Sequence, residues 1–144
     1  MKKLYYSALA YLIAALVSGV LWRELAKFND VTEATSLGKV HGHLMTLGFI
    51  MFLLFIIMER IFHISAHKQF NLFFIVYHIG VITATLMMLI RGYVSIMVIK
   101  GSLDLSDGLD AAISGMAGLS HIVLSLGLIL FMVILKKSLF PVKK

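Results

Sequence analysis

Residues 111–135 read AAISGMAGLSHIVLSLGLILFMVIL, an apolar run without a single Asp, Glu, Lys or Arg. A hydrocarbon core about 30 Å thick is crossed by roughly 20 helical residues, so a run of this length predicts a transmembrane helix. Toward the N-terminus, comparable runs occupy residues 4–25, 38–58 and 70–90. The sequence therefore predicts an all-α membrane protein, with residues 1–144 forming one four-transmembrane-helix up-down bundle.

The composition is typical of the same class. Hydrophobic residues make up 60% of the chain and charged residues 14%, and the mean hydropathy is +0.99, outside the usual range of soluble domains. Cysteine is absent, which excludes disulfides, thiolate metal ligands, iron–sulfur clusters and thiol nucleophiles. The net charge of +6 comes from basic residues at the edges of the apolar runs. It therefore indicates membrane topology and lipid-headgroup contact, not nucleic-acid binding.

Basic residues are spread unevenly between the two ends of the predicted bundle. The end that holds both termini carries most of the Lys and Arg, and nearly all the acidic residues lie at the other end. Because basic loops remain in the cytoplasm, the pattern predicts cytoplasmic termini and a multi-pass protein of the bacterial cytoplasmic membrane. Between the third and fourth runs, residues 91–100 either extend the third helix or lie along the interface. Asp110 is the predicted N-cap of the fourth helix.

Histidines inside the membrane are the first candidates for function, because burying ionisable groups in lipid is costly. Counted at about 1.5 Å per residue, His43 lies 16 positions before Glu59 and His121 lies 15 before Lys136, so both sit at one level in the outer half. His78 lies deeper by more than ~10 Å. It is more often hydrogen-bonded to a neighbouring helix than a ligand. Two imidazoles at one level on different helices are the arrangement that bis-histidine ligation of haem iron requires.

Small and polar residues recur near these histidines. In the fourth run they form the stripe Ser114, Gly118, His121 and Ser125, which is predicted to face the interior. In the first run they form the stripe Ser7, Tyr11, Ala14 and Ser18. Ser18 and Gly19 lie near the level of His43 and are expected to leave room for a macrocycle. Close helix packing explains the same small residues without a cofactor.

His41 and His43 form the most specific local pattern. Two positions on a helix are separated by about 200° of rotation, so the two imidazoles point to opposite sides and suit two different centres. The stretch His41-Gly42-His43-Leu44-Met45-Thr46-Leu47-Gly48 resembles the His-x-His helix in subunit I of the haem–copper oxidase superfamily. In that superfamily one histidine binds the high-spin haem and the other the low-spin haem. The resemblance implies these roles for His41 and His43, in that order.

The resemblance has a limited extent. The chain lacks the further histidine cluster and the cross-linked tyrosine that a copper partner needs, so haem ligation is implied without an oxygen-reducing binuclear centre. As a whole, the chain resembles small four-helix bacterial membrane families of unknown function.

Three functions remain open on these grounds. The first is a b-type cytochrome-like protein for electron transfer or diatomic gas sensing. Its haem b is expected to be ligated by His121 and by one of His41 and His43, with His43 preferred. Lys39 and Arg91 at the outer boundary either pair with its propionates or are snorkelling anchors at the lipid headgroups. The second is a small metal-ion transporter or channel that binds copper or zinc through the intramembrane histidines: His41, His43, His78 and His121. The third is a structural or assembly subunit.

The expected surroundings follow from these readings. The partners are the lipid bilayer, a quinone or a redox protein, and further copies of the chain in a homo-oligomer. No constellation typical of a hydrolase occurs, so no catalytic residue is predicted.

Overall fold

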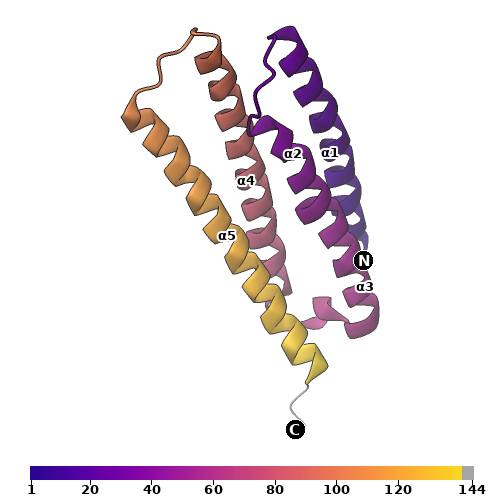
Figure 1. The fold of residues 1–144 in the computed structure, drawn as a ribbon. Coiled ribbons are helices and arrows are strands. Elements are labelled where there is room, and N and C mark those ends of the chain that lie inside the picture. The colour runs from indigo at the N-terminus through magenta and orange to yellow at the C-terminus, as the bar shows by residue number, and fades with distance from the viewer. Residues whose placement is uncertain (141–144) are drawn as a thin grey trace.

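The structure is a computed structural model that describes residues 1–140, and nearly all of these residues are helical (Figure 1). Within them, four helical spans are long and apolar enough to cross a membrane. These spans are α1 (Lys2–Phe28), the segment Leu37–Phe62, α4 (Phe70–Ile99) and α5 (Asp107–Leu139). The predicted all-α architecture with four spans is confirmed. Each helix extends beyond its apolar run, and α4 takes in most of the segment 91–100.

The second span consists of three helical segments joined end to end. These are α2 (Leu37–His43), the π-helix η1 (Leu44–Ile50) and α3 (Met51–Phe62). A π-helix is rare and frequently lies at a functional site, and this one begins directly after His43. The hydroxyl of Tyr77, on α4, donates to the Leu47 carbonyl of η1 at 2.7 Å. The hydrogen bond ties the π-helix to the neighbouring span.

The helices pack in the order α1, second span, α4, α5. The second span contacts α1 along its length, and α4 lies between the second span and α5 (Figure 1). Near its C-terminal end α5 also meets α3 and the short 3-10 turn η2 (Ile64–Ala66). Aromatic rings on three spans fill the core there: Phe52, Phe55, Phe73, Tyr77 and Phe131. Toward its N-terminal end α5 leans away from α2 (Figure 1).

Two glycines set the close approach of α4 and α5. A Cβ added at Gly80 would lie 2.5 Å from the Leu124 Cα, and one at Gly127 would lie 2.8 Å from the Tyr77 Cα. No side chain fits at either position without moving the backbones apart. Helix association in membranes uses such small residues because lipid supplies no hydrophobic driving force between helices.

The prediction that the stripe of the fourth run faces the interior is wrong. Ser114, Gly118, His121 and Ser125 are all exposed. The face that α5 buries carries Ile113, Ser120, Leu124, Gly127, Phe131 and Ile134. Because α5 is apolar on most sides, its polarity alone does not select the packed face.

Both described ends of the chain lie at the η2 end of the bundle. His67, just after η2, shares a hydrogen bond of 2.8 Å with Ser138 near the end of α5. A hollow at this end is lined by residues 1–4 together with Ser65 and Phe70. At the opposite end Ser106, not Asp110, caps α5, because the Ser106 hydroxyl accepts from the Leu109 amide. The Asp110 carboxylate instead forms an ion pair with Arg91.

Candidate functional site

His43 and His121 are brought together from two different spans. His43 is the last residue of α2 and His121 lies midway along α5. Their ring centres are 6.5 Å apart and their ring planes are inclined by 86°. His43 is half-buried, whereas His121 is exposed.

Each ring of this pair is anchored through the same nitrogen. The Nδ1 of His43 lies 3.0 Å from the Lys39 carbonyl, and the Nδ1 of His121 lies 2.7 Å from the Ala117 carbonyl. A carbonyl only accepts, so Nδ1 carries the proton and donates in both rings. In a neutral imidazole the other nitrogen, Nε2, then keeps its lone pair. This arrangement is typical of metal-ligating histidines, whose second ring nitrogen is held by a carbonyl or carboxylate.

His41 points to a different helix from His43, as the rotation of about 200° predicts. Its Nδ1 donates to the Ala15 carbonyl of α1 at 2.8 Å. A Cβ added at Gly19 would lie 3.2 Å from that same nitrogen. The His41 ring therefore fills the space beside Ser18 and Gly19, and the expectation of room for a macrocycle there is wrong.

His78 has both ring nitrogens occupied. Its Nδ1 lies 2.7 Å from the Tyr11 hydroxyl and its Nε2 lies 3.1 Å from the Ser7 hydroxyl. Its ring packs against Phe52 and Phe74, with ring centres 4.8 and 4.5 Å away. No lone pair is left for a metal in this arrangement. Sequence reasoning found Ser7 and Tyr11 as a stripe but not their link to His78, because the two contacts cross from α1 to α4.

Lys39 and Arg91 lie toward the end of the bundle that is opposite the chain termini, relative to the histidine pair. Lys39 is exposed, one turn before His43. The Arg91 guanidinium pairs with Asp110 and lies 3.5 Å from the Ser114 hydroxyl. Ser114 precedes His121 by seven positions, about 10 Å along the helix. Lys39 and Arg91 therefore both lie on the same side of the histidine pair, and Arg91 is already paired with Asp110.

The space around the pair is open. A hollow of about 350 Å³ is lined by Gly42, His43, Thr46 and Leu47. A Cβ added at Gly42 or at Gly118, three positions before His121, would meet no atom within 4 Å. Among residues 1–140, no group of three or more His, Cys, Asp or Glu side chains could share a metal ion. The chain therefore offers two ligands to a single centre and room for a bulky group beside them.

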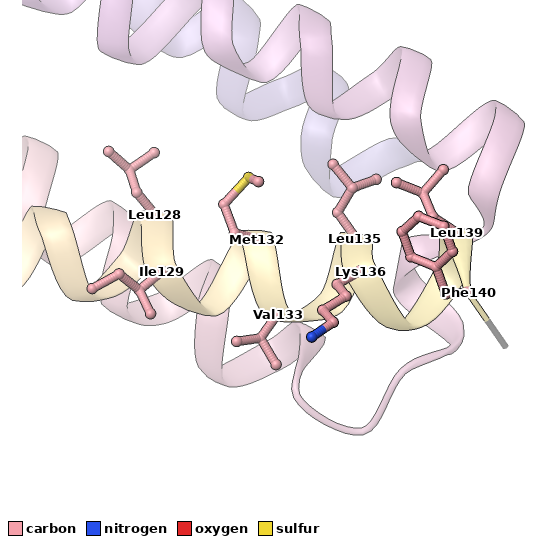
Figure 2. A pocket seen from close by; sticks show the side chains of 8 residues that line it. All are labelled: Leu128, Ile129, Met132, Val133, Leu135, Lys136, Leu139 and Phe140. Atoms are coloured by element: carbon pink, nitrogen blue, oxygen red, sulfur yellow. The ribbon is translucent and has the colours of Figure 1, made fainter. Parts of the chain in front are cut away.

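An apolar hollow near the C-terminal end of α5 is a weaker candidate. Figure 2 shows that its lining side chains all come from this helix and the residue after it. It measures about 550 Å³, and Lys136 is the sole charged residue of its lining. Such a surface suits lipid acyl chains and offers no set of ligands to a cofactor.

Comparison with known proteins gives one match. A family model described as "Protein of unknown function (DUF2871)" matches residues 1–138. No curated protein and no solved structure matches the chain. The description of the family names no activity, cofactor or partner, so the functional argument depends on the side chains themselves.

Proposed function

The chain belongs to the DUF2871 family, whose description assigns no activity, and from its own side chains we propose that it is a membrane haem protein that transfers electrons. In this proposal His43 of the second span and His121 of α5 would hold one haem b through their Nε2 atoms. Haem iron supplies one-electron chemistry by cycling between its ferric and ferrous states.

The spacing of His43 and His121 carries the proposal. With a metal–nitrogen bond of about 2 Å, two imidazoles on opposite sides of one ion have ring centres about 6 Å apart. The observed separation is 6.5 Å. Both rings also keep Nε2 free, because Nδ1 donates to the main chain in each. Spacing and tautomer therefore both suit one iron between the two rings.

The number of ligands favours haem over a bare metal ion. Haem brings four nitrogens of its own and needs two side chains, whereas zinc in proteins takes three or four. Among residues 1–140 no group of three or more suitable side chains exists. A zinc site would need more ligands than the pair offers.

Two axial histidines also favour electron transfer over gas sensing. With both axial positions filled, a diatomic gas binds only by displacing His43 or His121, whereas an electron needs no open position. Lys39 and Arg91 would pair with the haem propionates. Asp110 would then share the Arg91 guanidinium, with which it pairs in the structure.

The surroundings follow from the same proposal. The bias of basic residues supports cytoplasmic termini in a bacterial cytoplasmic membrane, which puts the haem in the outer half of the bilayer. Ser114 and Ser125 are exposed on α5, and in membranes such small polar residues are enriched where helices contact one another. Their exposure supports a homo-oligomer in which a second copy covers the part of the stripe that haem leaves free.

An optical spectrum tests the proposal. Protein purified from haem-replete cells, or supplied with haem after purification, should be red and show sharpened visible bands on reduction. His121→Ala and His43→Ala should each lose the haem or change its spectrum. His63→Asn is the matched control, because it removes a histidine at a left-handed position (φ 49°) that asparagine tolerates.

Two outcomes would count against the assignment. A preparation that stays colourless after haem is supplied excludes a haem protein, and copper or zinc found by elemental analysis would favour the transporter. A coloured protein whose spectrum is unchanged in His121→Ala binds haem by other residues.

A further inference from the structure

A second groove lies between α1 and α4, with Leu44 of η1 on its floor. It measures about 610 Å³, within the range of about 300–1,000 Å³ that ligand sites occupy. Ala10 and Ala14 on α1 and Ile82 and Leu86 on α4 line it and are exposed. In a membrane the groove therefore faces the hydrocarbon region, and its ligand would enter from the lipid.

One polar cluster stands in this apolar groove, formed by Ser7, Tyr11 and His78. The Ser7 hydroxyl donates to the Lys3 carbonyl at 2.9 Å, so it accepts from the Nε2–H of His78 at 3.1 Å. A neutral ring protonated at Nε2 accepts at Nδ1, and the Tyr11 hydroxyl therefore donates to Nδ1 at 2.7 Å. Both hydroxyl protons are already used, that of Ser7 on the Lys3 carbonyl and that of Tyr11 on His78. The hydroxyl oxygens of Ser7 and Tyr11 keep lone pairs that can accept from a ligand.

The rest of the lining limits the ligand further. The Thr85 hydroxyl also donates its proton within the protein, to the Val81 carbonyl at 2.8 Å. Of the described residues that line the groove, none is Lys, Arg, Asp or Glu. A phosphate or carboxylate head would find no cation there, which argues against phospholipid and fatty-acid heads. The exposed Tyr6 ring instead gives the groove an aromatic surface.

We propose that this groove binds the head of a lipid-soluble quinol. A quinol has an aromatic ring, hydroxyl groups that donate to the Tyr11 and Ser7 oxygens, and an apolar tail that lies along Leu86 and Leu89. Binding does not require the haem.

Direct binding to the full chain in detergent micelles tests the site. The probe is a short-tailed quinol kept reduced, and titration calorimetry should show one saturable site per chain. The dimethyl ether of the same quinol has no hydroxyl to donate and should bind at least tenfold more weakly. Palmitate should not compete.

Two variants on one helix locate the site. Ala14→Phe fills the groove without touching the hydrogen-bonded cluster and should weaken binding at least tenfold. Val17→Phe is the matched control, because Val17 is also exposed on α1 but does not line the groove. Ser7→Ala is a second, milder test that should weaken binding severalfold, since it removes one acceptor.

Several results would overturn the inference. These are no saturable binding, equal binding of the dimethyl ether, competition by palmitate, or unchanged affinity in both Ala14→Phe and Ser7→Ala. If haem is absent but quinol binds as described, the proposed function fails while this site stands. If haem is present and quinol does not bind, the quinol site fails while the proposed function stands.

Discussion

Replacing Gly80 with Ala should force α4 and α5 apart. The added Cβ would lie 2.5 Å from the Leu124 Cα and 2.6 Å from the Leu124 nitrogen. Non-bonded carbon atoms rest about 3.5–4.0 Å apart, so α5 must move by about 1 Å. Backbone atoms cannot rotate out of the way as a side chain can. Overpacking of this kind costs about 1–3 kcal/mol.

A glycine on the facing helix, α5, isolates this packing effect. Gly115 lies on α5 where an added Cβ would meet no atom within 4 Å. Gly115→Ala therefore changes only the helix propensity, which favours Ala over Gly by up to about 1 kcal/mol. Because both variants share this gain, the difference between their free energies of unfolding reports the overpacking alone. The expected difference is about 1–3 kcal/mol, with Gly80→Ala less stable.

Reversible unfolding in mixed micelles, with SDS as the denaturant, measures the difference. The haem spectrum gives a second readout, because α5 carries His121 and a shift of about 1 Å alters its distance from His43. Gly80→Ala should hold less haem than Gly115→Ala. If the two variants are equally stable and hold equal haem, α4 and α5 do not approach as closely as the structure has them, and the reasoning is refuted.

Three further predictions concern other parts of the molecule. Tyr77→Phe leaves the Leu47 carbonyl of η1 without its partner and should lower the free energy of unfolding by about 1–3 kcal/mol; unchanged stability in the same SDS titration would argue against this bond. Arg91→Gln should leave the protein red but release haem severalfold faster to apomyoglobin, and an unchanged rate would remove Arg91 from the propionate site. In intact cells, Asp104→Cys should react with a membrane-impermeant thiol reagent and Ser65→Cys should not; the reverse would invert the proposed topology.

The spans could be predicted from the sequence, but the packed faces could not. Hydropathy identifies a membrane helix because lipid contact and core contact both demand apolar residues. For the same reason hydropathy does not distinguish the face of a helix that contacts lipid from the face that packs against other helices. The stripe through His121 is the most polar of α5, yet the helix packs through Gly127 and Leu124, where shape rather than polarity decides.

Two local features depend on contacts between distant residues. No sequence pattern predicts the π-helix after His43. It is held in part by the hydrogen bond from the Tyr77 hydroxyl on α4 to the Leu47 carbonyl, a contact between residues 30 positions apart. Asp110 looked like a cap, but Arg91 on α4 pairs with it and Ser106 caps α5. In contrast, the similar heights of His43 and His121 along the bundle could be predicted by counting residues, because the rise per helical residue is nearly constant.

Low-temperature electron paramagnetic resonance of the oxidised protein tests the central claim most directly. Two histidine ligands would give low-spin ferric haem, and ligand rings inclined by 86°, as they are in the structure, would give it a highly anisotropic low-spin signal. The account predicts that signal in the unaltered protein, and its replacement by a high-spin signal or none in His121→Ala. A high-spin signal in the unaltered protein, or no ferric haem signal after haem is supplied, would contradict ligation by His43 and His121.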